Sequence, residues 1–140
     1  MQPVAVQAQS SSCVSSAEKQ ALDTRVLLTE LMIAGLSCGL SNQYNTFVTS
    51  FRPQLQQQGA TLKALFARLH GQNAPDQLHT FVTDLANNAS QRSHLIGYGY
   101  CHFVGNIFAE ASGVSPGNLQ RLTGRPWIPM RHSYRICSSS

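Results

Sequence analysis

Charged side chains are scarce in this 140-residue chain, in which Asp, Glu, Lys and Arg make up only 11% of the residues. An average globular protein has about a quarter. Ser, Gln, Asn and Thr supply the polarity instead, a composition more usual in exported than in cytosolic proteins. No apolar run is both long enough and free enough of charge to span a bilayer. We expect one domain with a real core and no transmembrane segment.

Motifs for catalysis and for cofactor binding are also missing. The chain has no Gly-rich phosphate loop, no GxSxG elbow and no dinucleotide fingerprint. The histidines show no HxxxH or HExxH spacing. Cys101 and His102 are adjacent, but neighbouring residues on a helix point about 100° apart and do not face each other. We predict no catalytic residue, no bound metal and no cofactor. The histidines are His70, His79, His94, His102 and His132.

The four cysteines include no CxxC pair, which removes support for a zinc ribbon, a thioredoxin-like pair or a covalent haem site. Their even number and wide spacing predict two disulfides and an oxidising compartment. Four cysteines allow three connectivities. We favour Cys38–Cys101, joining a central helix to the late core, and Cys13–Cys137, joining the two tails. The alternative is buried free thiols in a cytosolic protein.

The first residues, MQPVAVQAQSSS, lack the basic and apolar regions of a complete signal peptide. Val6-Gln7-Ala8 nevertheless fits a small-x-small cleavage pattern, so this start resembles the end of a signal peptide. We therefore expect a periplasmic or secreted protein, given either as its mature form or from a late start. Residues 1–16 are expected to form a flexible N-terminal segment unless Cys13 is bridged.

Residues 22–38, LDTRVLLTELMIAGLSC, predict the central helix of an all-α fold. Their apolar side chains cover most of the helix circumference, and a helix that is apolar nearly all round is a buried one. Ser15 or Ser16 is positioned to cap its start, with Glu18 in the first turn. Gly35 and Gly39 mark its end.

Three further amphipathic stretches complete a helical domain over residues 17–112. From 42 to 70 one apolar stripe keeps its phase, which predicts a single helix kinked near Pro53 or two helices meeting there almost in line; we favour the kink. Helices of about 75–93 and 99–112 follow, because Gly97 and Gly99 interrupt the pattern. We predict four to five helices around the central one.

The last 28 residues, 113–140, predict an extended basic arm. They contain no acidic residue, and Pro126 and Pro129 impose extended conformations on the residues before them. Residues 1–112 carry six basic and six acidic side chains, so the net charge of +4 resides in the arm's four arginines. Arg, Trp and Tyr dominate interface energetics. The predicted partner-binding residues are Arg121, Arg125, Trp127, Arg131, Tyr134 and Arg135.

Two readings of the arm are compatible with each other. It can wrap a partner and become ordered on binding, or it can fold back over its own helices with Cys137 as a staple. Nucleic acid is a possible acidic partner, but +4 over 28 residues is a modest charge and export argues against it.

Glu30 is the one unexplained residue of the central helix. A buried carboxylate can act as a general acid, but more often it forms an ion pair, and we expect Arg92 or Arg68 to be the partner. A catalytic alternative places a pocket between helices. Its candidate lining residues are Glu30, Tyr98, Tyr100 and His102.

The stretches TRVLLTELMIAGLSC, NQYNTFVTSFRPQL, LKALFARLHG and FVTDLANNASQRS…GYGYCHF resemble a group of small exported helical proteins from Gram-negative bacteria. The resemblance covers about residues 13–112. It implies export and a helical fold, and it carries no catalytic residue across. The basic arm lies outside it.

These observations favour a non-enzymatic accessory or interaction subunit of a larger exported assembly. Its arm would dock on a protein partner with an acidic or aromatic-accepting surface. On this view, removing residues 113–140 leaves the helical fold intact. The alternatives are a small periplasmic ligand-binding or enzymatic domain with a pocket near Glu30, and nucleic-acid binding through the arm.

Overall fold

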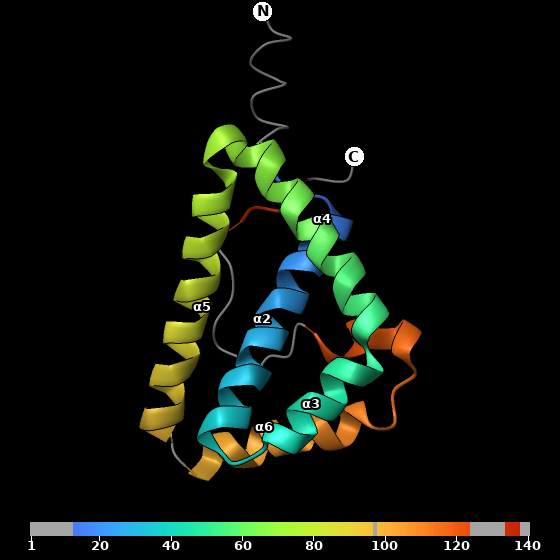
Figure 1. The fold of residues 1–140 in the computed structure, drawn as a ribbon, viewed down its shortest axis with the longest axis vertical. Coiled ribbons are helices and arrows are strands. Elements are labelled where there is room, and N and C mark those ends of the chain that lie inside the picture. Colours follow the sequence, from blue (N-terminus) through green and yellow to red (C-terminus); the bar gives the residue numbers. More distant parts are fainter. Residues whose placement is uncertain (1–12, 97, 124–133, 138–140) are drawn as a thin grey trace, which may run out of the picture.

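The computed structural model describes residues 13–96, 98–123 and 134–137, and within them the chain is all-α, as the sequence predicts. Among the described residues, two short 3-10 helices, η1 and η2, accompany five α-helices (Figure 1). The one pairing of extended backbone in this part of the chain is an isolated parallel bridge between Val14 and Ile136. The elements are α2 (Ser16–Ser37), α3 (Ser41–Ser50), α4 (Arg52–His70), η1 (Gly71–Asn73), α5 (Ala74–Ile96), α6 (Tyr98–Ala111) and η2 (Pro116–Leu122).

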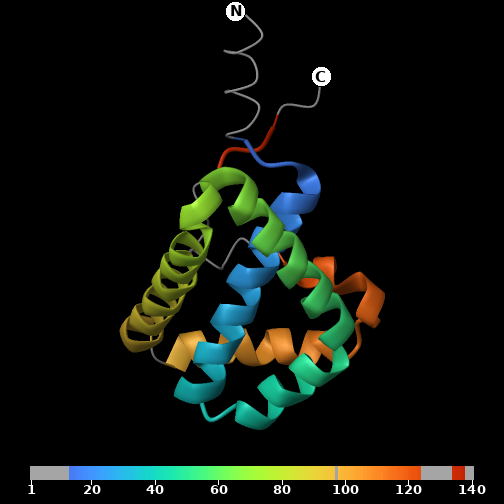
Figure 2. The same ribbon diagram turned by 45° about the horizontal axis from the view of Figure 1, so that its top comes forward.

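Helix α2 is central, as its apolar circumference predicts. It runs between α4 and α5 with α3 and α6 across its far end (Figures 1 and 2), and it contacts all four of these helices. Ser15 caps it in a capping box with Glu18, so two donors of the first turn are satisfied. Its side chains enter both hydrophobic clusters of the core. Leu36, in its last turn, departs from the prediction because it is 75% exposed.

The amphipathic stretch 42–70 forms two helices that meet at a corner rather than almost in line (Figure 1). Phe51 ends α3 and begins α4, and its ψ of 16° turns the chain. Pro53 falls in the first turn of α4, where a missing N–H costs nothing. One non-helical residue barely shifts the helical phase, so the apolar stripe stays on the core. Phe47 and Leu65 on either side are both buried.

The predicted break between the last two helices is confirmed, with α5 ending at Ile96 and α6 beginning at Tyr98. The chain therefore turns so that α6 lies across the lower end of the molecule (Figure 2). There the Cys38–Cys101 disulfide joins the end of α2 to α6, with 5.6 Å between the two Cα atoms. This pairing is the one predicted.

Residues 113–123 differ from the extended arm expected there. Pro116–Leu122 forms η2, and the side chains of Leu119 and Leu122 are buried in the main hydrophobic cluster. Burial of two leucines stabilises a fold by several kcal/mol at about 1.5–3 kcal/mol each. These residues therefore belong to the helical domain. Removing all of 113–140 would open the core, contrary to the expectation from the sequence.

In the described parts of the chain, no helix is long and apolar enough to cross a membrane.

Candidate functional site

The C-terminal residues 134–137 are fastened to the start of α2. Cys137 forms the predicted disulfide with Cys13, with a Cα–Cα distance of 4.9 Å. Val14 donates its N–H to the Arg135 carbonyl at 2.8 Å and accepts from the Cys137 N–H at 2.7 Å. Cys13 and Val14, expected to be flexible unless Cys13 was bridged, are buried. The end of the arm thus folds back on its own domain.

Tyr134, predicted to bind a partner, packs on the protein's own helices. Its ring meets Phe66 of α4 and Phe81 of α5 nearly edge-on, at centroid distances of 5.9 and 6.2 Å. Burial raises the pKa of the Tyr134 hydroxyl. Arg121 on η2 and Arg135 are exposed. The remaining three predicted residues, Arg125, Trp127 and Arg131, lie outside the described residues.

Arg68 reinforces this C-terminal anchor from α4. Its guanidinium donates to both carboxylate oxygens of Glu18, at 2.6 and 3.1 Å, and to the Cys13 carbonyl at 3.0 Å. The bidentate pair lowers the pKa of Glu18, with the Arg68 hydrogen bonds as the largest cause. One arginine therefore connects α4, the cap of α2 and the segment that carries the Cys13–Cys137 disulfide.

Glu30 is held in a buried ion pair with Arg92, one of its two predicted partners. Nη2 of Arg92 donates to Glu30 Oε1, and Nε donates to Oε2 at 3.4 Å. The Glu30 side chain is only 3% exposed and that of Arg92 13%. Tyr100 donates its hydroxyl to the Glu30 main-chain carbonyl at 3.4 Å, and burial raises the pKa of that hydroxyl. The carboxylate is engaged on both oxygens, which suits a structural role.

Of the four residues proposed to line a catalytic pocket, the three whose side chains the structure describes, Glu30, Tyr100 and His102, line none of the cavities found among the described residues. Glu30 and Tyr100 are buried, whereas His102 is exposed and its ring lies beside Phe103. The Tyr98 side chain lies outside the described residues. Cys101 is a half-cystine, so the adjacent Cys101–His102 pair has no thiol to use as a nucleophile. The cavities described below are lined by other residues.

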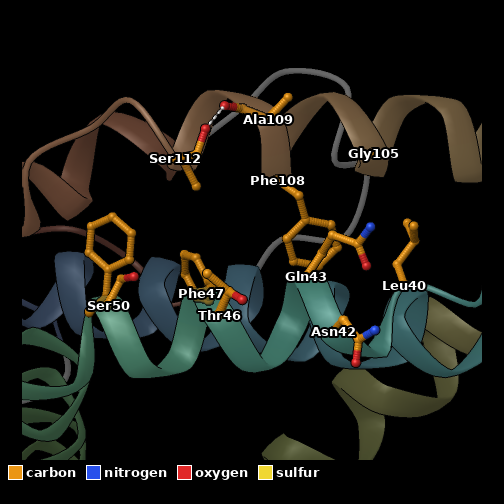
Figure 3. Close-up of a pocket in the computed structure, with 12 residues that line it drawn as sticks. Leu40, Asn42, Gln43, Thr46, Phe47, Ser50, Gly105, Phe108, Ala109 and Ser112 are labelled. Atoms are coloured by element: carbon orange, nitrogen blue, oxygen red, sulfur yellow. Dashed lines mark hydrogen bonds between the residues drawn. The ribbon is translucent and has the colours of Figure 1, made fainter.

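A cavity of about 530 Å³ lies between α3 and α6 (Figure 3). Phe47 and Phe108 form part of its apolar wall, and Phe108 reaches from α6 towards α3. Asn42, Gln43 and other neutral side chains form its rim, and no lining residue is charged. Gly105 contributes no side chain, so that part of the cavity is open. The volume falls within the range of about 300–1,000 Å³ usual for small-molecule sites.

A smaller cavity, of about 240 Å³, lies between α2, α4 and α5, and two basic side chains, Arg25 and Lys63, line it. Arg25 lines it from α2, and the Nε atom of that guanidinium is buried without a hydrogen-bond partner in the part of the chain that the structure describes. Burial lowers the pKa of Arg25. Gly59 and Gln58 line it from α4. We call it the Arg25 cavity.

Sequence reasoning questioned Glu30 but passed over Arg25, although both are charged residues in a helix that is apolar nearly all round. The signal was present: Arg25 and Glu30 are the same kind of exception to the pattern of residues 22–38. The sequence did not indicate which of the two residues would have an ion-pair partner. Glu30 meets an arginine 62 residues further on, and Arg25 faces a cavity.

Comparison of the chain with family models, with curated proteins and with solved structures finds no match.

Proposed function

We propose that this protein is a non-enzymatic accessory subunit of a larger exported assembly, and that it docks through its basic C-terminal arm. The partner is a protein with an acidic or aromatic-accepting surface. The compartment is the periplasm or the cell exterior, in which the two disulfides persist.

Segregation of charge is the observation that carries this proposal. Residues 1–112 have six basic and six acidic side chains, whereas residues 113–140, from η2 to the C-terminus, have four arginines and no acid. The described ion pairs neutralise three acids within the helical domain: Asp23 pairs with Lys19, Glu18 with Arg68, and Glu30 with Arg92. The arm therefore brings an excess of guanidinium groups, which form paired hydrogen bonds with carboxylates.

Attachment at both ends supports the same role. Before the segment 124–133, Leu122 is buried and Thr123 accepts a hydrogen bond from Gln20 at 3.4 Å. After it, Tyr134 packs on α4 and α5, and Cys137 is bridged. The described residues on both sides of Arg125, Trp127 and Arg131 are therefore fixed to the helical domain.

A triple variant tests the proposal without disturbing either anchor. Arg125→Gln/Trp127→Ala/Arg131→Gln keeps η2, Tyr134 and the disulfide to Cys13. Tagged wild-type protein is expected to co-purify with its partner from the exported fraction, and the triple variant is expected to lose that partner. Binding of the wild type should weaken as salt is raised, because exposed charge pairs are screened.

A matched control removes positive charge from the helices instead. Arg52 and Lys63 are both exposed on α4, so Arg52→Gln/Lys63→Gln lowers the net charge by two, as the triple variant does. This control is expected to retain the partner. Equal recovery of the partner by the triple variant and the wild type would show that the arm is not the docking element.

A further inference from the structure

Arg25 is a half-buried cation for which the described residues supply no carboxylate partner. Its Nε atom is fully buried and has no hydrogen-bond partner among those residues. Taking a charge out of water costs free energy unless a partner compensates it. Burial already lowers the pKa of this guanidinium. An anion in the cavity would offset that cost.

The remaining walls of the Arg25 cavity are mostly apolar, include the basic side chain of Lys63, and carry no carboxylate. Side chains from three helices form them, and Gln58 adds a second buried polar atom, Oε1, that has no hydrogen-bond partner. A site of this composition suits a molecule with one anionic end and an apolar body. The apolar wall consists of Leu28, Leu55, Leu62, Leu78 and Val82.

Gly59 keeps the cavity open. It lies within α4, where glycine costs roughly 0.5–1 kcal/mol relative to alanine. A Cβ atom built on it would meet nothing within 4 Å, so packing does not require glycine there. By contrast, a Cβ on Gly35 would lie 3.1 Å from Tyr44, a close approach of α2 and α3 that does require it. The space beside Gly59 is therefore not explained by the fold.

Two further cavities adjoin the Arg25 cavity along α4. One, of about 340 Å³, shares Leu28 and Leu55 with it and is lined by Arg52. The other, of about 530 Å³, shares Lys63, Leu78 and Val82. None of the residues lining these three cavities is acidic. Three adjoining, mostly apolar cavities therefore lie along α4, and the basic residues Arg52, Arg25 and Lys63 line them.

We propose that the Arg25 cavity binds a monocarboxylate with an unbranched apolar tail, such as a medium-chain fatty acid. The carboxylate would pair with the Arg25 guanidinium, and the tail would lie along Leu28, Leu55 and the adjoining cavities. Charge complementarity selects this ligand class over a neutral one. The site is separate from the arm, so it stands or falls independently of the proposed docking function.

Titration of the full, disulfide-bonded chain with sodium decanoate tests this assignment. Amide chemical shifts in two-dimensional NMR spectra should change around Arg25, Gly59 and Val82, and should saturate. Decanol, with the same tail and no charge, is expected to bind at least about tenfold more weakly, because it cannot form the charge-assisted pair. Arg25→Gln is expected to weaken decanoate binding by a similar factor.

A pair of glycine substitutions provides the matched control. Gly59→Leu puts a side chain into the Arg25 cavity and should abolish binding. Gly105→Leu makes the same change in α6, where a Cβ also meets nothing within 4 Å, but fills the α3–α6 cavity of Figure 3 instead. It should leave decanoate affinity unchanged. Both variants replace glycine within a helix, so neither should impair folding.

Three results would overturn the proposal. The first is an absence of shift changes with millimolar decanoate. The second is equal affinity for decanoate and decanol, which would mean that Arg25 takes no part. The third is loss of binding in Gly105→Leu with retention in Gly59→Leu, which would move the site to the α3–α6 cavity. If Arg25→Gln does not fold, the glycine pair still decides.

Discussion

Glu30 and Arg25 are both charged residues in the mostly apolar helix α2, but their surroundings differ. Glu30 is compensated by Arg92 through two hydrogen bonds in a site almost closed to water. Arg25 has no comparable partner among the described residues, and it borders a cavity. At the scale of single residues, Glu30 has a structural partner, whereas Arg25 is the residue to which we assign the proposed ligand.

The Glu30–Arg92 pair gives a direct stability prediction. Arg92→Met leaves a carboxylate buried without a partner, and breaking a buried pair in this way typically costs about 3–5 kcal/mol. The double variant Glu30→Leu/Arg92→Met removes both charges and should recover most of that loss. Urea unfolding followed by circular dichroism at neutral pH measures both. A double variant no more stable than Arg92→Met would mean that lost packing, rather than the unpaired charge, sets the cost.

At the scale of elements, the sequence predicts the helices well because their signals are local. Apolar periodicity and the Ser15 cap place α2, and Gly97 places the break before α6. The corner at Phe51 was not predicted, because a one-residue break preserves the phase of the apolar stripe. The structure of 113–123 was not predicted either. Leu119 and Leu122 lie among prolines and glycines, and only the surrounding helices make them core residues.

The same division applies to the candidate site. Both disulfides and the Glu30–Arg92 pair were predicted because each required only a choice among a few residue types. The Arg25 cavity and the Arg68 link to Cys13 depend on distances between helices, which no local pattern encodes.

The start of α2 should give stability a dependence on acid pH. In the folded protein the pKa of Glu18 lies below its ordinary value of 4.5, mainly because Arg68 donates to the carboxylate. A lowered folded-state pKa contributes stability that is fully present above the unfolded pKa and is lost as pH falls through the folded one. Glu18→Gln should therefore lower the melting temperature at pH 7, and the difference from wild type should shrink well below 4.5.

Arg68→Gln supplies the control for this prediction. It removes the largest cause of the lowered pKa, so adding Glu18→Gln to it should have little further effect at pH 7. Melting curves recorded by circular dichroism across the acid range measure all four proteins. A difference between wild type and Glu18→Gln that is the same at every pH would contradict the proposed origin in ionisation.

At the scale of the whole molecule, the two disulfides join different parts of the chain. Cys38–Cys101 lies within the helical core and joins α2 to α6, across a sequence separation of 63. Cys13–Cys137 has a separation of 124 and closes nearly the whole chain. In the chain-entropy model, disulfides that close loops of these lengths stabilise the fold by about 4 and about 5 kcal/mol, so their energies do not distinguish them. Their positions do distinguish them, because only Cys13–Cys137 fixes the C-terminal residues to the helical domain.

Replacing each disulfide by a pair of serines should therefore produce different defects. Without Cys13–Cys137, the Val14–Ile136 bridge and the Tyr134 contacts are no longer supported by a covalent bond. Trypsin should then cleave after the exposed Arg135 much faster than in the wild type. This difference is expected at a temperature at which the helical circular dichroism signal is unchanged. Without Cys38–Cys101, the melting temperature should fall while cleavage at Arg135 in the folded protein stays slow. Limited proteolysis followed by mass spectrometry, alongside thermal melts, separates the two. Equal cleavage rates in both variants would mean that the C-terminal residues are held by packing alone, and that the arm needs no disulfide to stay anchored.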